Sequence, residues 1–232
     1  GKLTLLVEAL AYDDLKRLQE VSDALQTRSW LQRAVTVSPY RCAVEPLRQQ
    51  ASHAVERQGD VWLHRLGPQH RLVLVGAGSL AETLSSLALN MEYDVCVLDP
   101  RADKLNAWRG PPISLLGGEL IEHIDALDEP NTSLITLTHD RDIDDESLWL
   151  SRDSTYAFIG ALGSRRTSAN RKRRLLERGM SEAQLDRIHA PVGLDIGSKT
   201  SMEIAVSILA QLTRLKRGMM TQDVLRRLSL VI

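Results

Sequence analysis

The sequence is poor in cysteine and has no large excess of charge of either sign. Its 232 residues include only Cys42 and Cys96, which excludes a disulfide framework and a cysteine-rich zinc site. The formal net charge of −1 argues against a general nucleic-acid binder, whose affinity would need a broad basic surface. We therefore expect neither a metal site nor a nucleic-acid partner.

Long apolar segments are also absent from the sequence. No apolar run reaches the roughly 18 residues that suggest a membrane-spanning helix, and no signal sequence opens the chain. These absences predict a soluble, cytoplasmic protein without a membrane partner. The chain begins with Gly1 and enters a strand-like run at once, which suggests a cut chain. With 43% hydrophobic residues it can bury a full core, and its length suggests one large domain with a smaller appendage.

Residues 71–101 have the pattern of a strand, a turn, a helix and a second strand. The runs 72–75 and 95–98 are entirely apolar, as in parallel strands that are covered on both faces. Between them, apolar residues recur at helical spacing from residue 80 to residue 88. This segment therefore predicts the first unit of a parallel α/β sheet.

The turn in this segment carries the glycine pattern of a dinucleotide-binding loop. Gly76 lets the chain turn off the strand, Gly78 lets the backbone approach a phosphate, and Ala81 lets the helix lie close to the sheet. The N-terminus of that helix offers unpaired N–H groups to an anion. Asp99 closes the next strand, where an acid accepts hydrogen bonds from a ribose diol. The pattern therefore predicts a nucleotide-type site.

Strands and helices continue to alternate after Asp99. The capping box Thr200-x-x-Glu203 begins a long helix that runs through Leu215. We therefore expect an α/β fold with a doubly wound, Rossmann-like parallel sheet and helices on both faces. Further strands are predicted over residues 113–116, 133–138 and 156–159, and further helices over residues 103–108 and 120–127 and from residue 164 onward.

The first part of the chain, residues 1–68, predicts a small α+β segment that precedes a Rossmann-like domain over residues 69–232. Pro39 and Pro46 predict a loop, and Cys42 is expected within it. Because the segment is too short to bury its own sheet, we expect it to pack on the larger domain or on a neighbouring chain. Its predicted elements are strands over residues 3–10, 30–37 and 61–66 and a helix over residues 13–26.

In an open parallel sheet the ligand lies beyond the carboxyl ends of the strands, where the strand order reverses. Several polar and glycine residues follow predicted strands here, so we expect them to converge on one crevice. Arg165 and Arg166 begin a helix, where cations are unfavourable unless an anion is near. Lys172, Arg173 and Arg174 are instead expected on a solvated face. The candidate cofactor-binding residues are Gly76, Gly78, Ser79, Leu80, Asp99, Pro100, Arg101, Thr138, His139, Gly163, Ser164, Arg165 and Arg166.

His139 and Asp140 are the candidates for proton transfer. No nucleophile, and no group other than Asp140 that would orient His139, is visible in the sequence. The alternative is a histidine whose ring is satisfied by backbone groups at the end of a strand. We expect neither cysteine to carry sulfur, because Cys96 falls in a buried strand and Cys42 has no neighbouring histidine.

Longer motifs then carry a family resemblance. They are Leu137-Thr-His-Asp140, Gly160-Ala-Leu-Gly-Ser-Arg-Arg-Thr167, Ile188-His-Ala-Pro-Val-Gly-Leu-Asp-Ile-Gly197 and Glu203-Ile-Ala-Val-Ser-Ile-Leu209. With these motifs the chain resembles the XdhC/CoxI family, the xanthine dehydrogenase accessory factors, from Arg71 to about Gly218. The resemblance implies binding of the molybdenum cofactor, molybdopterin, and its delivery to a xanthine-dehydrogenase-like molybdenum hydroxylase. Because delivery is often coupled to sulfuration of the metal, a cysteine desulfurase is a further implied partner.

The sequence also departs from the family pattern. Relatives have an N-terminal domain that ends near a cysteine, and this sequence does not include it. Ser79 and Arg141 stand where relatives usually have histidines. We therefore expect weaker cofactor binding than in relatives, and a homodimer that covers the N-terminal segment. Two alternatives stay open: an NAD(P)-dependent oxidoreductase, although no tyrosine–lysine pair for proton transfer is apparent, and a vestigial nucleotide-binding dimerisation module.

Overall fold

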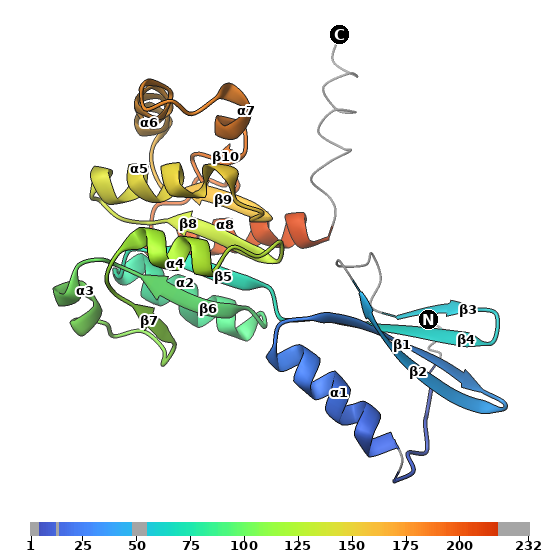
Figure 1. The fold of residues 1–232 in the computed structure, drawn as a ribbon. Coiled ribbons are helices and arrows are strands. Elements are labelled where there is room, and N and C mark those ends of the chain that lie inside the picture. Colours follow the sequence, from blue (N-terminus) through green and yellow to red (C-terminus); the bar gives the residue numbers. More distant parts are fainter. Residues whose placement is uncertain (1–4, 13, 48–54, 218–232) are drawn as a thin grey trace. The chain divides into compact units, whose positions relative to one another are not determined.

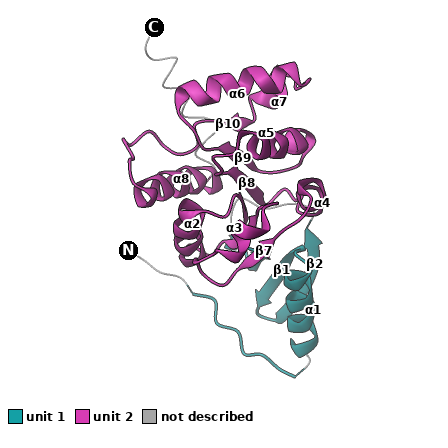
Figure 2. Ribbon diagram, turned by 90° about the vertical axis from the view of Figure 1, so that its left-hand side faces the viewer, with its two compact units in different colours: residues 1–69 teal, residues 70–232 magenta. Residues whose placement is uncertain are grey.

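The computed structural model describes residues 5–12, 14–47 and 55–217 (Figure 1). The chain forms two compact units, residues 1–69 and residues 70–232 (Figure 2). The first contains a four-stranded sheet and the second a six-stranded sheet. Within the described ranges, no helix is both long enough and apolar enough to cross a membrane.

The six-stranded sheet of the second unit is parallel throughout and has the order β10-β9-β8-β5-β6-β7. This is the doubly wound order of the Rossmann fold, in which the chain reverses direction across the sheet between β5 and β8. The doubly wound fold predicted from the sequence is confirmed. The strands are β5 (Arg71–Val75), β6 (Asp94–Leu98), β7 (Ser114–Leu116), β8 (Thr132–Thr136), β9 (Phe158–Ala161) and β10 (Ile188–His189).

Helices cover both faces of this sheet, as predicted. On one face lie α2 (Ser79–Asn90) and α8 (Ser201–Lys216), with α3 (Ala102–Asn106) beside them. On the other lie α4 (Leu120–Ala126), α5 (Arg141–Leu150), α6 (Arg165–Glu177) and α7 (Glu182–Leu185), and a 3-10 turn over Ser151–Asp153 follows α5.

The central strands are apolar at every position because both of their faces are buried. In β5, Leu72 and Leu74 contribute to the core under α2 and α8, whereas Val73 and Val75 contribute to the core under α4, α5 and α6. All four side chains have no exposed surface. Alternate side chains of a strand point to opposite faces, so a run without polar residues serves two cores at once.

Over its described residues, the first unit has an antiparallel sheet of order β2-β1-β4-β3 and one helix. Two expectations for it were wrong. Residues 40–47 form a strand, not a loop, so Cys42 lies in regular structure; Pro46 is tolerated because β2 is an edge strand and needs fewer ladder donors. Residues 5–10 form no strand, and residues 3 and 4 lie outside the described ranges. The elements are α1 (Asp14–Gln26), β1 (Trp30–Val37), β2 (Tyr40–Leu47), β3 (Val55–Gln58) and β4 (Val61–Leu66).

Burial on α2 yields a test of this packing. Leu84 has no exposed surface, whereas Leu89 on the same helix is 38% exposed. We expect Leu84→Ala to lower the free energy of unfolding by about 2–5 kcal/mol, through lost apolar burial and a residual cavity. Leu89→Ala is the matched control and should cost about 1 kcal/mol or less. Urea denaturation followed by circular dichroism measures both, and equal losses would contradict the packing described.

Candidate nucleotide and cofactor site

A hollow of about 370 Å³ lies at the carboxyl ends of β5 and β8, where the strand order reverses. The loop after β5, the first turn of α2, the loop after β8 and the start of α8 surround it. This is the place at which doubly wound folds bind nucleotides. Its lining residues are Gly76, Ala77, Gly78, Ser79, Leu80, Ala81, Arg101, Lys104, Leu137, Thr138, His139, Leu162, Ser201 and Ile204.

The two glycines of the loop have different physical reasons to be glycine. Gly76 has a φ of 113°, and a Cβ atom there would lie 2.6 Å from Cγ2 of Thr138. Gly78 has a φ of −133°, which any residue adopts, and a Cβ atom there would meet no heavy atom within 4 Å. Fold geometry therefore explains Gly76 but not Gly78. The space that a side chain at Gly78 would occupy is left open in front of α2.

The N-terminus of α2 has no side-chain cap. Its N-cap residue is Gly78, which has no side chain with which to accept hydrogen bonds from the first turn. The first N–H groups of a helix carry a partial positive charge and need an acceptor. Ser79 and Leu80 of this turn line the hollow, so an anion placed there would supply that acceptor.

Asp99 lies beneath the loop and has no exposed surface. Its carboxylate accepts hydrogen bonds from the backbone N–H of Ala77 at 2.8 Å and of Arg101 at 3.0 Å. It also accepts two from the Arg101 guanidinium, both at 2.8 Å. Burial acts to raise the pKa of Asp99, but the hydrogen bonds from Arg101 and Ala77 outweigh it and lower the pKa. Asp99 thus holds the glycine loop, and Arg101 is the residue of this pair that lines the hollow.

His139 and Asp140 are adjacent in sequence but do not work as a pair. The carboxylate of Asp140 caps α5 by accepting hydrogen bonds from the N–H groups of Asp142 at 3.0 Å and Ile143 at 3.4 Å. The ring of His139 is exposed, lines the hollow and makes no hydrogen bond to any of the described residues. Among these residues, therefore, no acid orients the His139 ring for proton transfer.

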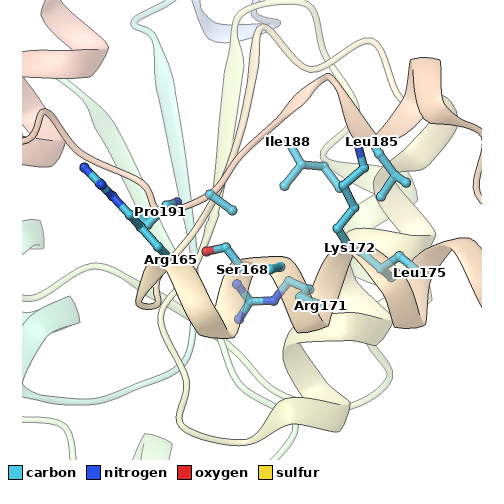
Figure 3. Close-up of a pocket in the computed structure, with 10 residues that line it drawn as sticks. Arg165, Ser168, Arg171, Lys172, Leu175, Leu185, Ile188 and Pro191 are labelled. Atoms are coloured by element: carbon cyan, nitrogen blue, oxygen red, sulfur yellow. The ribbon is translucent and has the colours of Figure 1, made fainter.

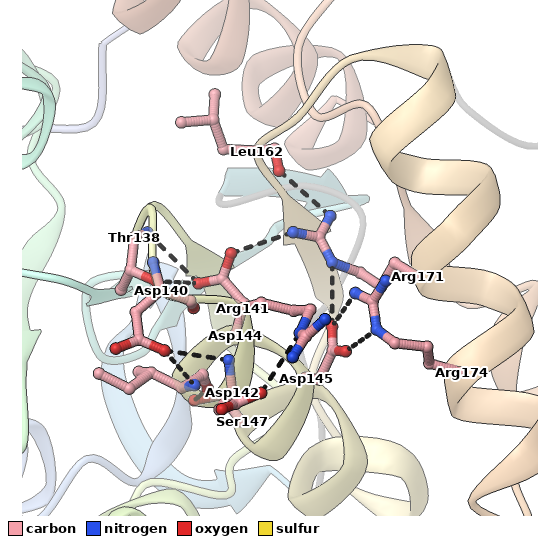
Figure 4. Close-up of polar contacts among 11 residues, drawn as sticks. Thr138, Asp140, Arg141, Asp142, Asp144, Asp145, Ser147, Leu162, Arg171 and Arg174 are labelled. Carbon is pink, nitrogen blue, oxygen red and sulfur yellow. Dashed lines mark hydrogen bonds and ion pairs between the residues drawn. The ribbon is translucent and has the colours of Figure 1, made fainter.

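A buried ion pair holds the loop after β8 in place (Figure 4). Asp144 of α5 and Arg171 of α6 are 2% and 4% exposed, and their side chains meet at 3.0 Å. The other oxygen of Asp144 accepts hydrogen bonds from the Thr138 hydroxyl at 2.7 Å and the Thr138 N–H at 3.3 Å. Arg171 also donates to the carbonyl of Leu162, after β9, at 3.1 Å. One pair thus joins the ends of two strands to two helices.

Asp144 titrates in an unusual range for an aspartate. Burial raises the pKa of Asp144 to about 6, which exceeds the lowering by the Thr138 hydrogen bond and the Arg171 charge. Sequence reasoning missed the pair, because Asp144 and Arg171 stand within charged runs that resemble solvated helix faces. The only sequence signal is helical phase: Asp144 and Leu148 share one buried stripe of α5, and Arg171 and Leu175 share one of α6.

The basic residues of α6 are paired and buried to a greater degree than the sequence suggests. Arg174 lies in a two-bond ion pair with Asp145, and its side chain is only 28% exposed, so the expectation of a solvated residue was wrong for it. Lys172 and Arg173 are 48% and 71% exposed, as expected. Two arginines of α6, Arg171 and Arg174, therefore pair with acids of α5.

The turn after β9 borders a neighbouring hollow of about 460 Å³. Gly163 and Arg165 line it, and it shares Leu162 and Ile204 with the hollow at the glycine loop. Arg165 is 88% exposed and pairs with Asp195 at 3.0 Å.

The predicted site residues are therefore distributed over two adjoining hollows. Of these residues, Asp99 lies beneath the loop, Ser164 caps α6, and the exposed residues Pro100 and Arg166 line neither hollow. Within the described part of the chain, no three histidine, cysteine, aspartate or glutamate side chains are grouped as a metal site requires.

The fold and the open glycine loop define a Rossmann-type protein with a nucleotide-type hollow at the reversal point of the sheet. Comparison with known families is specific: a family model described as the XdhC Rossmann domain matches residues 72–212. The chain belongs to the XdhC family, so the resemblance inferred from the sequence motifs is confirmed.

The chain is also similar to three curated proteins. It is 33% identical over 164 residues to the uncharacterized protein YqeB of Escherichia coli, covering 68% of this chain and 30% of that protein. It is 27% identical to a probable xanthine dehydrogenase subunit of Bacillus subtilis (68% and 46% covered) and 28% identical to the molybdenum cofactor insertion chaperone PaoD of Escherichia coli (64% and 41% covered). The chain thus spans less than half the length of each of these relatives.

A solved structure shares the fold. The crystal structure of a xanthine dehydrogenase from Bacillus halodurans superposes with a TM-score of 0.69 at 23% identity, covering 90% of this chain and 66% of that one. At this identity the likeness supports the architecture and not the activity.

The buried pair leads to a pH-dependent prediction. Arg171→Met keeps the bulk of the side chain but leaves Asp144 buried without its cation, so we expect a loss of about 3–5 kcal/mol in the free energy of unfolding at pH 7.5. Because Asp144 has a raised pKa, the folded state binds its proton more tightly than the unfolded state, and stability falls as pH rises through about 6. At pH 5, below that pKa, Asp144 of the folded protein is mostly protonated and no longer needs the charge of Arg171, so the loss should be smaller there.

Urea denaturation at the two pH values measures this effect. Arg173→Met on the exposed face of α6 is the matched control and should change stability by about 0.5 kcal/mol or less. A loss in Arg171→Met that is the same at both pH values, or no greater than that of the control, would count against the role of the pair.

Proposed function

We propose that this chain is the nucleotide-fold part of an accessory protein that binds the molybdenum cofactor and assists its maturation and insertion into a xanthine-dehydrogenase-type molybdenum hydroxylase. Membership of the XdhC family supports this function. So does similarity to a protein named as a molybdenum cofactor insertion chaperone. The protein acts, on this proposal, through the enzyme it loads and not on that enzyme's substrate.

The observation that carries the proposal is the open space at Gly78. Neither the backbone nor a protein neighbour requires a glycine there, and the space lies in front of an uncapped helix N-terminus. Arg101 and Lys104 line the same hollow and add positive charge. A phosphate group fits this arrangement, since it would accept from the first turn of α2 and face the two cations. The molybdenum cofactor carries such a phosphate on its pterin.

The residues fit the phosphate end of the cofactor better than its metal end. Among the described residues, His139 is the only histidine or cysteine that lines the hollow, and Cys96 lies inside β6 with 5% exposure. On this proposal the chain holds the cofactor by its phosphate, and the metal's ligands come from the pterin. We infer further that a cysteine desulfurase is a second partner and that the chain forms a homodimer, with neither cysteine carrying sulfur.

An NAD(P)-dependent oxidoreductase is the second candidate. The strand order and the glycine loop favour it, because both are typical of nicotinamide-binding domains. Two features of the site weigh against it: Asp99 is already engaged by Arg101 and Ala77, and His139 has no orienting acid among the described residues. A vestigial dimerisation module is the third candidate.

Ligand binding by the purified chain separates these candidates. The chain is mixed anaerobically with cofactor released from a molybdenum hydroxylase, or with NAD⁺ or NADP⁺, and the bound molybdenum or nucleotide is measured after gel filtration. We expect retained molybdenum. Gly78→Val fills the open space and should weaken retention by about tenfold or more, the equivalent of one charge-assisted contact.

Ser86→Val places the same side chain on the exposed side of the same helix and is the matched control; its retention should equal that of the unmodified chain. Retention of nucleotide alone would favour the oxidoreductase, and retention of neither ligand would favour the vestigial module. Equal molybdenum retention in Gly78→Val and Ser86→Val would remove the glycine loop from the site.

The cellular role has its own prediction. Deletion of the gene should leave the hydroxylase synthesised and folded but poor in cofactor, because the enzyme's own fold does not depend on this chain. The measurement is the molybdenum content of the purified hydroxylase per protomer, with the gene restored as control. A fully loaded and fully active hydroxylase in the deletion strain would overturn the proposal.

A further inference from the structure

A smaller hollow of about 260 Å³ lies between α6 and the segment that carries α7 and β10 (Figure 3). It shares no lining residue with the hollow at the glycine loop. Its walls are mainly apolar and include Leu175, Leu185, Ile188 and Pro191. It lies on a part of the fold that the proposed function does not use.

Two residues that line this hollow, Ser168 and Arg171, each have a buried polar atom that makes no hydrogen bond within the described structure. Ser168 of α6 is 9% exposed, and its hydroxyl makes no hydrogen bond within the described structure. Figure 3 shows this hydroxyl directed toward Pro191, and less than 1 Å² of its oxygen is exposed. Buried hydroxyls nearly always have a hydrogen-bond partner, because leaving one unmade is unfavourable. A ligand oxygen in the hollow would supply the missing partner once the Ser168 side chain rotates toward it.

The charged residues around the hollow are all cations. Arg165, Ser168 and Lys172 follow one another at i, i+3 and i+7, which places them on one face of α6. Arg165 and Lys172 are paired with exposed acids, Asp195 at 3.0 Å and Glu182 at 2.7 Å. Exposed ion pairs of this kind contribute little free energy, so a ligand anion can replace the acids.

The third cation lies deeper. Arg171 is 4% exposed and is committed to Asp144 and to the carbonyl of Leu162. It is therefore a fixed part of the wall, although its Nε makes no hydrogen bond within the described structure and lies 3.5 Å from a carboxylate oxygen of Asp145. Of the residues that the structure describes, no acidic one lines the hollow.

We propose that this hollow is a second ligand site, which binds a small organic anion with an apolar body, namely an aryl or short-chain aliphatic carboxylate. The apolar body occupies the space beside Leu175, Leu185 and Ile188. The carboxylate accepts a hydrogen bond from Ser168 and faces Arg165 and Lys172. Sites for drug-sized ligands begin at roughly 300 Å³, so the hollow is too small for a dinucleotide or a pterin cofactor.

The test uses 4-fluorobenzoate as the probe and fluorine NMR of the probe as the readout. We expect saturable binding to the unmodified chain. The uncharged analogue 4-fluorobenzyl alcohol has the same apolar body and should bind about tenfold more weakly, because it lacks the charge-assisted contacts. Ser168→Ala should weaken benzoate binding by a similar factor.

Two further variants locate the site. Ala169 is exposed on α6 and lines the hollow, so Ala169→Trp should block it without disturbing the core. Lys172→Gln and Arg173→Gln each remove one positive charge from α6, but only Lys172 lines the hollow. We expect Lys172→Gln to weaken binding and Arg173→Gln to leave it unchanged; circular dichroism confirms that each variant is folded.

Several results would overturn the proposal. One is the absence of saturable benzoate binding to the unmodified chain. Another is undiminished binding in folded Ala169→Trp, which would place the probe elsewhere. Equal binding of the alcohol and the benzoate, or equal effects of Lys172→Gln and Arg173→Gln, would show that the hollow does not select an anion. None of these results bears on cofactor binding at Gly78, so the two proposals stand or fall separately.

Discussion

The buried pair of Asp144 and Arg171 is the constraint on which the edge of the sheet depends. Taking two charges out of water is costly, and such a pair stabilises a fold only when hydrogen bonds satisfy its remaining atoms. Here Thr138 donates to Asp144 and the carbonyl of Leu162 accepts from Arg171, and both lie at the ends of strands. Nε of Arg171 makes no hydrogen bond within the described structure and lies 3.5 Å from a carboxylate oxygen of Asp145. Thr138 in turn lies against Gly76 so closely that no Cβ atom fits between them. The geometry of the glycine loop is thus tied to an ion pair between two helices on the far face of the sheet.

A second buried carboxylate, that of Asp99, holds the glycine loop from the other side of the reversal point. Asp99 holds the backbone of Ala77 and the guanidinium of Arg101, and its pKa is lowered accordingly. The carboxylates of Asp99 and Asp144 are therefore both engaged by hydrogen bonds and ion pairs within the protein. What remains directed at the hollow is positive or neutral: the first turn of α2, Lys104, His139 and Arg101, whose charge is balanced by Asp99. Since the negative charges are buried and paired, this edge of the sheet favours an anionic ligand.

The sequence was sufficient for the features that depend on local pattern. Apolar runs predicted the central strands because those strands are buried on both faces, and the glycine spacing predicted the loop because one backbone conformation requires it. It was insufficient where a side chain is paired across the fold. Asp144 and Arg171 are separated by 27 residues, and each stands in a run of charges, so nothing local distinguishes them from solvated neighbours. In the first unit, Pro46 led to the wrong prediction of a loop. A strand accepts a proline when it lies at the edge of a sheet, and which strand is the edge depends on long-range pairing.

At two positions, 79 and 141, the resemblance implies histidines in relatives, and the surroundings of these two positions differ. Ser79 is in the first turn of α2 and lines the hollow, so a residue there reaches any ligand bound at the glycine loop. Arg141 begins α5 and is not part of that lining; its side chain is 66% exposed and pairs with Asp142. Only the change at Ser79 therefore alters the chemistry offered to a bound ligand. It replaces an imidazole, which can ligate a metal, with a short hydroxyl, which hydrogen-bonds a phosphate well but is a poor ligand for a soft metal. The departure from the family pattern thus offers any ligand in this hollow a hydrogen-bonding hydroxyl in place of a metal-ligating ring.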